Sequence, residues 1–132
     1  MMKPENTFIG SVHKHLPENV YRMKNNNQYN SGIADVWYSG PAADLWVEYK
    51  FIKIPARKDT VIDIALSELQ KKWLIDRHNE GRNVAVIVGS KDGGVYFPDI
   101  SWSFQPYNAK FFRDAMVPRK TLAEFIGEFT GG

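Results

Sequence analysis

The sequence predicts one α/β domain. Two runs with the composition of β-strands, residues 33–38 and 45–54, lie on either side of the turn sequence Ser39-Gly40-Pro41. A nearly continuous aliphatic run over residues 83–88 is typical of a strand covered on both faces. Segments before and between these runs carry apolar residues at helical spacing. A length of 132 residues fits one such domain over residues 1–132.

The N-terminal elements alternate between helix and strand. A first amphipathic helix is expected to begin at Pro4 and to end before Pro17, with its apolar face formed by Phe8, Ile9, Val12 and Leu16. Residues 20–24 are expected to form a short strand. The polar stretch NNNQYNSG, residues 25–32, favours a loop. The runs 33–38 and 45–54 then predict a hairpin.

A second helix is expected after the polar, basic stretch 55–60. Its apolar positions are Leu69, Trp73, Leu74 and Ile75, and Gly81 ends it. The start of this helix has two interpretations. Ser67 and Gln70 have the spacing of a capping box, whereas the apolar stretch VIDIAL, residues 61–66, could extend the helix backward.

The C-terminal third is the least regular part of the sequence. Gly93-Gly94 is expected to turn the chain into a short strand over residues 95–97, and an irregular aromatic-rich segment follows up to Pro118. Thr121 and Glu124 then predict a capping box that opens a final helix. Residues 97–132 therefore form a C-terminal extension whose role the sequence leaves undetermined.

Composition excludes several classes of protein. Hydrophobic residues make up 43% and charged residues 24%, and no apolar run approaches the roughly 20 residues of a membrane helix. The N-terminus lacks the pattern of a secretory signal, so a cytoplasmic protein is the default expectation. The absence of cysteine excludes disulfides and thiolate metal sites, so a metal would need oxygen or imidazole ligands. A net charge of +2 gives only weak support for a nucleic-acid partner.

Three charged residues lie inside the apolar strand runs. Asp35 belongs to the first run, and Glu48 and Lys50 belong to the second. Alternate residues of a strand share a face, so Glu48 and Lys50 are expected to be neighbours, and a hairpin can bring Asp35 opposite or diagonal to Glu48. A salt-bridge ladder on an exposed sheet face is the alternative interpretation.

Two neighbouring carboxylates repel each other unless a cation lies between them. Mg²⁺ suits such a pair because it prefers oxygen ligands and is commonly held by one or two carboxylates together with waters and phosphates. A magnesium ion there could bind a phosphodiester and lower the pKa of a bound water, while Lys50 could stabilise charge on the phosphate. We therefore expect Mg²⁺ as the cofactor, with Mn²⁺ able to replace it.

These residues also resemble a known family. Asp35 followed by Glu48-Tyr49-Lys50 is similar to the D…(D/E)xK signature of the PD-(D/E)xK, restriction-endonuclease-like nuclease superfamily, with Ala34 in place of the proline. Over roughly residues 5–97, the stretches NSGIADVWYSG, LWVEYK, LSELQKKWL and EGRNVAVIVG resemble its VRR-NUC-type and Holliday-junction-resolvase-like branches. The resemblance implies a central mixed sheet flanked by helices.

The resemblance also implies roles for individual residues. Asp35 and Glu48 would bind the metal together with the backbone carbonyl of Tyr49, Lys50 would be the catalytic lysine, and Gln70 would support the site. Glu5 matches an additional glutamate on the first helix of that branch. For Gln70, capping of its own helix is an equal alternative. Glu5 could instead be favoured simply by the dipole of the first helix.

Binding of DNA is expected to use the basic stretch after the second strand run. Lys53, Arg57 and Lys58 have no acidic residue among them, although a solvated face is the alternative. Tyr29 and Tyr107 are the better candidates for stacking on bases, because the four tryptophans, Trp37, Trp46, Trp73 and Trp102, are expected in the core.

Taken together, the residues and the resemblance predict a magnesium-dependent DNA endonuclease, with branched DNA or a Holliday junction as the structure that it cuts. A homodimer is expected because a cut in both strands needs two sites, with contacts from the segment 102–112 and the first helix. The resemblance to small resolvases suggests a bacteriophage protein acting in the host cytoplasm. The alternative is a catalytically inactive nucleic-acid-binding or assembly module with the same fold.

Overall fold

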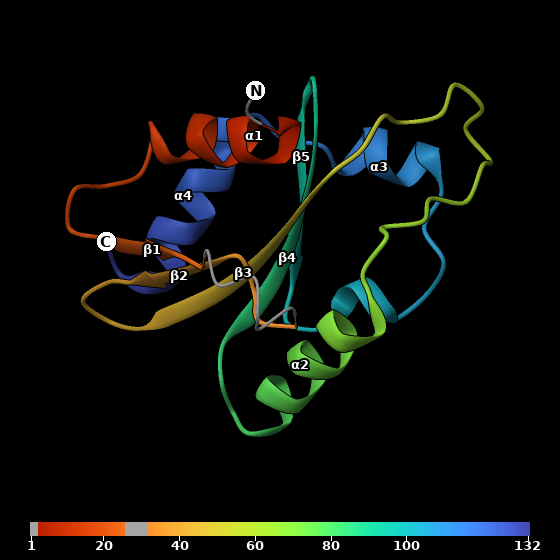
Figure 1. Cartoon of the computed structure of the whole chain (residues 1–132). Coiled ribbons are helices and arrows are strands. Elements are labelled where there is room, and N and C mark those ends of the chain that lie inside the picture. The colour runs from red at the N-terminus through yellow and green to blue at the C-terminus, as the bar shows by residue number, and fades with distance from the viewer. Residues whose placement is uncertain (1–2, 26–31) are drawn as a thin grey trace.

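The computed structural model describes residues 3–25 and 32–132. These residues form a five-stranded sheet with helices packed on both faces (Figure 1). In chain order the elements are α1 (Pro4–His13), β1 (Tyr21–Lys24), β2 (Val36–Ser39), β3 (Asp44–Phe51), α2 (Glu68–Asn79), β4 (Val84–Ser90), β5 (Gly93–Pro98), the 3₁₀ turn η1 (Ser101–Ser103), α3 (Ala109–Ala115) and α4 (Arg119–Thr130). The predicted loop over residues 25–32, with Tyr29, lies almost entirely outside the described residues.

The sheet is mixed and its strands follow the order β1-β2-β3-β4-β5. Strands β1, β2 and β3 are antiparallel neighbours, with Val36 opposite Val47. Strand β3 then pairs in parallel with β4, and β4 pairs antiparallel with β5. All seven residues of β4 are buried, as predicted for a strand that is covered on both faces. The α/β fold with a central mixed sheet flanked by helices is confirmed.

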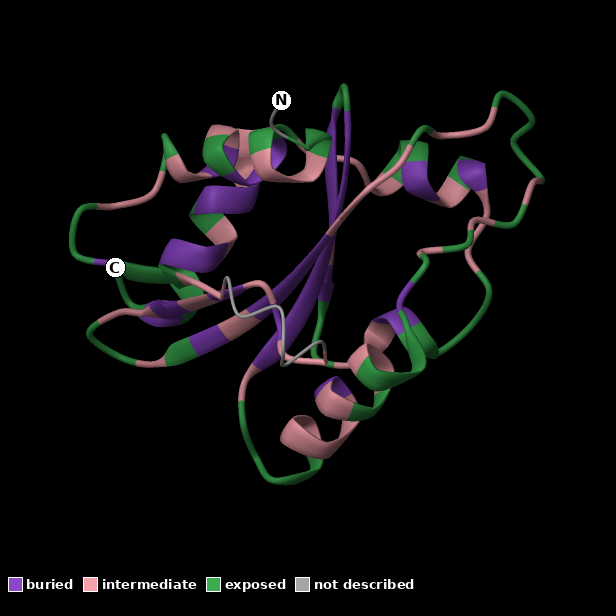
Figure 2. Cartoon of the chain, in the orientation of Figure 1, coloured by how far each residue is buried: buried purple, intermediate pink, exposed green. Residues whose placement is uncertain are grey.

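The core consists of two clusters, one on each face of the sheet. Helices α1 and α4 cover one face, where Phe8, Val12, Leu122 and Ile126 pack against Tyr49. The other face is covered by α2, α3 and the segments beside them, with Leu74, Phe112 and Trp102 against Val86 and Val88. Figure 2 shows the buried residues gathered along β3, β4 and the inner sides of these helices. No helix in the described part of the chain is long and apolar enough to cross a membrane.

Helix α2 begins at the predicted capping box, and its backward extension over residues 61–66 is wrong. Ser67 accepts from the Gln70 amide, and the Gln70 side chain accepts from the Ser67 amide. Ala65 has φ of 65°, outside the right-handed helical region, and its amide donates to the Asp63 carboxylate at 2.8 Å. The alternating apolar residues of this stretch, Ile62 and Ile64, instead pack an extended segment onto the second cluster.

Gly93-Gly94 is part of strand β5 and does not form the turn that the sequence predicted. Residues 91–92 make the turn. Gly93 has φ of 142°, and a Cβ there would collide with the Val117 carbonyl oxygen. Gly94 and Val117 exchange two backbone hydrogen bonds of 2.9 Å. The glycines therefore allow the segment before α4 to lie close to the sheet.

Two further predictions in the C-terminal third are wrong. The segment expected to be irregular contains η1 and α3, whose N-cap Asn108 accepts from the Phe111 amide at 2.9 Å. Helix α4 begins at Arg119, after Pro118, so Thr121 lies inside its first turn and caps nothing. The region beyond residue 97 belongs to both core clusters through α3 and α4.

Candidate functional site

Strand β3 places Glu48 and Lys50 side by side, as its alternation predicts. Lys50 Nζ lies 3.5 Å from Glu48 Oε2. Asp35 comes immediately before β2, and because Val36 is opposite Val47, Asp35 faces the Glu48–Tyr49 step. Its Oδ2 accepts a hydrogen bond of 2.9 Å from the Tyr49 amide. The structure thus brings Asp35, Glu48 and Lys50 together.

Glu48 is buried, with 1% of its surface exposed. Its Oε2 accepts from Gln70 Nε2 at 3.1 Å, whereas its Oε1 is buried and has no hydrogen-bond partner among the described residues. Burial, and next the negative charge of Asp35, raise the pKa of Glu48 to about 9, against the opposing effect of Lys50. Such a carboxyl group keeps its proton at neutral pH unless a cation compensates its charge.

Gln70 makes both of the contacts between which the sequence could not choose. Its Oε1 accepts from the Ser67 amide at 2.9 Å, which completes the capping box, while its Nε2 donates to Glu48. An amide side chain can do both because it carries an acceptor and a donor group at opposite positions. The start of α2 is thereby tied to the centre of β3.

Helix α1 brings a third carboxyl group, that of Glu5, close to the pair. The pKa of Glu5 is raised mainly by burial and next by the negative charge of Asp35, whereas the positive charges of Lys50 and Lys24 lower it. Glu5 therefore lies near Asp35, as the comparison with the family's first helix implied.

A divalent cation fits the donors of this site. The unpartnered Glu48 Oε1 is a buried oxygen that requires a proton or a cation. In a strand the N–H and C=O of one residue point toward the same neighbour, so the Tyr49 carbonyl faces the same side as its amide, which binds Asp35. No group of three or more histidine, aspartate and glutamate side chains is preassembled around a metal position in the described part of the chain. The arrangement suits Mg²⁺, which uses few protein ligands and keeps its waters.

The predicted DNA-binding residues lie on the exposed segment that follows β3. Lys53, Arg57 and Lys58 are all exposed. Arg57 is within 3.6 Å of Asp59, which offsets part of its charge. The structure records no hydrogen bond or ion pair for the side chains of Lys53 and Lys58 within the described ranges.

The tryptophans predicted for the core differ in burial. Trp102 is buried, Trp46 and Trp73 are partly buried and pack against the second cluster, and Trp37 belongs to neither cluster. Trp37, Trp46 and Trp73 form a row of ring contacts with centroids 6.2 Å and 5.4 Å apart. This row shares the sheet face of Glu48. Tyr107, predicted to stack on bases, packs its ring against Phe111 with centroids 4.5 Å apart, and its hydroxyl donates to the Ser101 carbonyl.

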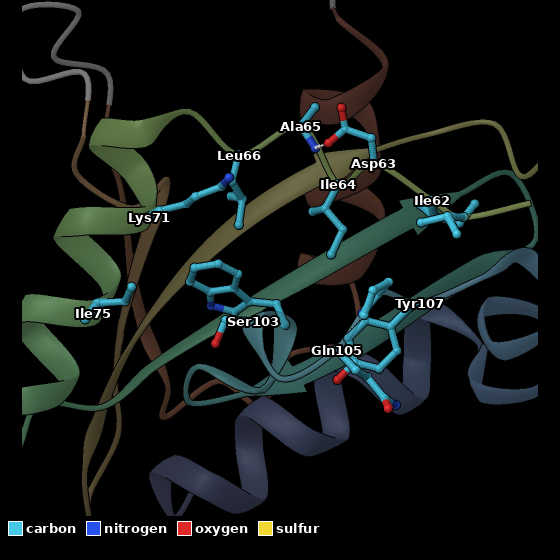
Figure 3. Close-up of a pocket in the computed structure, with 13 residues that line it drawn as sticks. Ile62, Asp63, Ile64, Ala65, Leu66, Lys71, Ile75, Ser103, Gln105 and Tyr107 are labelled. Carbon is cyan, nitrogen blue, oxygen red and sulfur yellow. Dashed lines mark hydrogen bonds between the residues drawn. The ribbon is translucent and has the colours of Figure 1, made fainter.

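A cavity of about 490 Å³, which no sequence pattern predicted, lies beside the start of α2. It lies between the extended segment 61–66 and the segment 102–107 (Figure 3). Its lining is largely apolar, and none of the predicted site residues reaches it. Its one cationic lining residue, Lys71, is 3.4 Å from Glu68.

One solved structure has a closely similar arrangement of elements. It is Hjc, a Holliday junction resolvase of the archaeal hyperthermophile Archaeoglobus fulgidus, which superposes with a TM-score of 0.58 at 15% sequence identity over 95% of this chain and 97% of that one. The chain has the fold of this resolvase. No protein-family model matches the sequence, and no curated protein matches it.

The match to the resolvase extends beyond the region of sequence resemblance. Because it covers 95% of the chain, it includes most of residues 98–132, for which the sequence pattern offered no counterpart. The shared fold therefore includes most of the region in which α3 and α4 lie. At 15% identity the likeness concerns the fold alone.

Proposed function

We propose that this chain is a divalent-metal-dependent endonuclease that hydrolyses phosphodiester bonds of DNA. The observation that carries the proposal is the buried Glu48 carboxyl group, whose Oε1 has no partner among the described residues and which lies beside Asp35 and Lys50. A charged cluster of this kind is costly to bury without a function. The shared resolvase fold supports a nuclease over other α/β proteins.

Asp35, Glu48 and the Tyr49 carbonyl would hold Mg²⁺ or Mn²⁺, with Glu5 available from α1. When bound, the metal supplies a water of lowered pKa and neutralises charge on the phosphate. Gln70 fixes the orientation of the Glu48 carboxylate through its Nε2. The Lys50 side chain is only 18% exposed and lies beside Glu48, where its ammonium would stabilise the charge that develops on the phosphate. Lys53, Arg57 and Lys58 would attract the DNA backbone.

Branched DNA, such as a four-way junction, is the proposed substrate, and a homodimer the proposed active form. Hjc is described as a Holliday junction resolvase. One copy of this chain offers one pair of carboxylates, so a paired cut requires two copies related by a twofold axis.

Single substitutions at the site test the proposal. Asp35→Asn and Glu48→Gln should each reduce cleavage of a labelled four-way junction by at least about 100-fold, since each removes an anionic metal ligand. Both should bind the junction as well as the unchanged protein or better, because they remove negative charge near phosphate. Calorimetry with Mn²⁺ should lose its binding signal in both variants.

Lys50→Ala distinguishes a role of Lys50 in the cleavage step from a role in binding DNA. It should lower the rate at saturating DNA by orders of magnitude with little change in DNA affinity, because its interaction is strongest in the transition state. Lys14→Ala, which removes an exposed lysine after α1, is the matched control and should cleave normally.

Normal cleavage by Asp35→Asn or Glu48→Gln would contradict the assignment of the metal site. A protein that binds junctions without any metal-dependent cleavage would instead support the alternative of a catalytically inactive DNA-binding module.

A further inference from the structure

A cavity of about 640 Å³ opens where the chain leaves β3. Its walls come from three places: residues 51–56 after the site, the turn between β4 and β5, and helix α3. In Figure 1 the turn after β4 and helix α3 lie on either side of the chain that continues from β3. The cavity therefore begins one residue beyond Lys50.

The rim of this cavity is cationic. Lys53, Lys91 and Arg113 line it, against a single carboxylate, that of Asp92. No ion pair with a carboxylate is recorded for these three cations within residues 3–25 and 32–132, whereas four of the other lysines and arginines on the loop after β3 and on α2 form such pairs. Three unneutralised cations around one cavity favour a polyanionic ligand.

Hydrogen bonds fix the turn that carries Lys91 and the side chain of Arg113. Arg119 donates to the carbonyls of Ser90 and Lys91 at 3.3 Å each, and its guanidinium lies 4.9 Å from the centre of the Phe8 ring. These contacts tie the turn that carries Lys91 to α4 and α1. Arg113 donates through Nη2 to the Pro55 carbonyl, which links α3 to the segment after β3. One hydrogen bond thus joins two walls of the cavity, and the third wall is anchored to α4 and α1.

The floor of the cavity is apolar. Phe51, Ile52, Ile54 and Met116 line it. A cationic rim above an apolar floor that includes an aromatic ring is the combination used to bind single-stranded nucleic acid, where phosphates meet the cations and bases meet the apolar surface.

The span from Lys50 to Lys53 is comparable to a few phosphate spacings of one nucleic-acid strand. Lys53 follows Lys50 by three residues, which span at most about 10 Å. A strand whose scissile phosphate lies at Lys50 would therefore present a phosphate only a few nucleotides away to Lys53, Lys91 and Arg113, since successive phosphates of one strand rise by about 3.4 Å in a duplex and lie farther apart when it is extended.

We propose that this cavity binds the DNA strand that runs on from the cut phosphate, with Lys91 and Arg113 as phosphate-binding residues. The proposal rests on the proposed nuclease function and adds a binding site for the flanking nucleotides, built by α3 and the turn between β4 and β5. Lys53 contributes from the same rim.

Binding measurements in the Glu48→Gln background test this without dependence on cleavage. Lys91→Ala should lower the affinity for a labelled four-way junction and reduce the slope of log K against log salt concentration by about 0.7–0.9, the value for one phosphate contact. With this difference in slope, the affinity lost through Lys91→Ala is about 5- to 8-fold larger at 0.1 M salt than at 1 M salt. Lys91→Arg should restore both quantities, and Lys14→Ala should change neither.

A scan of the DNA strand locates the contact. Each phosphate in turn is replaced by an uncharged methylphosphonate. One replacement, a few nucleotides from the cut, should weaken binding of the Glu48→Gln protein and have no further effect in the Lys91→Ala and Arg113→Ala variants. Lys91 is exposed on a turn, so its variant remains informative even if Arg113→Ala disturbs the contact with Pro55.

The outcomes separate this inference from the proposed function. Unchanged affinity and salt slope in Lys91→Ala, or additive effects of the methylphosphonate and the substitution at every phosphate, would overturn the binding site even if cleavage is established. If the methylphosphonate has no further effect in Lys91→Ala and Arg113→Ala, but the unchanged protein cleaves no DNA, the binding site would be supported and the proposed nuclease function would be wrong.

Discussion

Tyr38 links His13 to Tyr49 through the core. His13 Nε2 lies 2.7 Å from the Tyr38 hydroxyl, which lies 2.6 Å from the Tyr49 hydroxyl. Burial raises the pKa of both tyrosines, so their hydroxyl groups stay protonated. Because side chains alternate along β3, Tyr49 lies on the face opposite its neighbours Glu48 and Lys50. This chain of hydrogen bonds therefore fixes the strand that carries the candidate site from behind.

His13 makes the stability of the protein depend on pH. Burial first, and then the charges of Arg22 and Lys24, lower the pKa of His13 from 6.5 to about 4. Between these two values the unfolded chain binds a proton that the folded chain does not, so the free energy of unfolding decreases as pH falls. Stability linked to His13 is thus present above about pH 6.5 and is lost toward pH 4.

The variant His13→Gln can keep the hydrogen bond to Tyr38. Between about pH 4 and pH 6.5 we expect this variant to take up fewer protons on unfolding than the unchanged protein, by up to about one proton, so its stability should depend less on pH. Chemical denaturation at pH 7 and pH 5 measures it. His15→Gln, at an exposed position, is the control and should keep the original dependence. Equal pH dependence of His13→Gln and the unchanged protein would show that His13 is not responsible.

At the scale of single elements, the first turn of α2 combines a cap with a site contact. Ser67 contributes only to the cap, because its hydroxyl accepts from the Gln70 amide at 3.1 Å. Gln70 contributes to the cap and also donates to Glu48. These two residues allow helix stability and site geometry to be separated.

Ser67→Ala should lower the free energy of unfolding by about 1 kcal/mol, the usual cost of a lost N-cap. Gln70→Ala should lower the cleavage rate of the folded protein considerably more than Ser67→Ala does, because it leaves Glu48 Oε2 without its amide donor. Gln70→Glu retains the capping-box pattern and places a carboxylate against Glu48, so it should also cleave poorly. Denaturation curves and junction cleavage rates decide this, and equal rates for Ser67→Ala and Gln70→Ala would assign Gln70 to the cap alone.

At the scale of the whole molecule, the surfaces expected to form a dimer are largely used inside the chain. The apolar residues of α1, Phe8, Ile9 and Val12, are buried in the core, and so are Trp102 and Phe112 of the second expected surface. That part of the expectation is wrong, because α4 covers α1 and the sheet covers α3. Of the segment 102–112, Phe104 remains 70% exposed, and Val61, which lines the cavity of about 490 Å³, is 62% exposed.

We therefore expect a homodimer whose contact includes Phe104, with a preference for a four-way junction over a linear duplex of equal length. Phe104→Asp should shift the molecular mass measured by light scattering toward the monomer and weaken that preference in a competition assay. Phe129→Asp, on the partly exposed side of α4, is the control. A monomeric protein that cuts junction and duplex equally would leave the nuclease proposal without its preference for branched DNA.

The sequence by itself determined the features that depend on neighbouring residues. Alternation along one strand placed Glu48 and Lys50 on one face, and the spacing of Ser67 and Gln70 supplied the correct one of two possible starts of α2. The aliphatic run of β4 identified a strand buried on both faces. These predictions succeeded because the periodicity of a strand or a helix cap is encoded within a few residues.

Only the tertiary structure decided what lies against these elements. It brought Gln70 to Glu48 across 22 positions, gave Glu48 its burial and raised pKa, and assembled Lys91 and Arg113 with Lys53 around one cavity. It also formed α3 and seated Gly93 against Val117, where the sequence favoured an irregular segment and a turn. Burial, pKa and cavities depend on which surfaces meet, and contacts between distant segments leave no local pattern that could be recognised in the sequence.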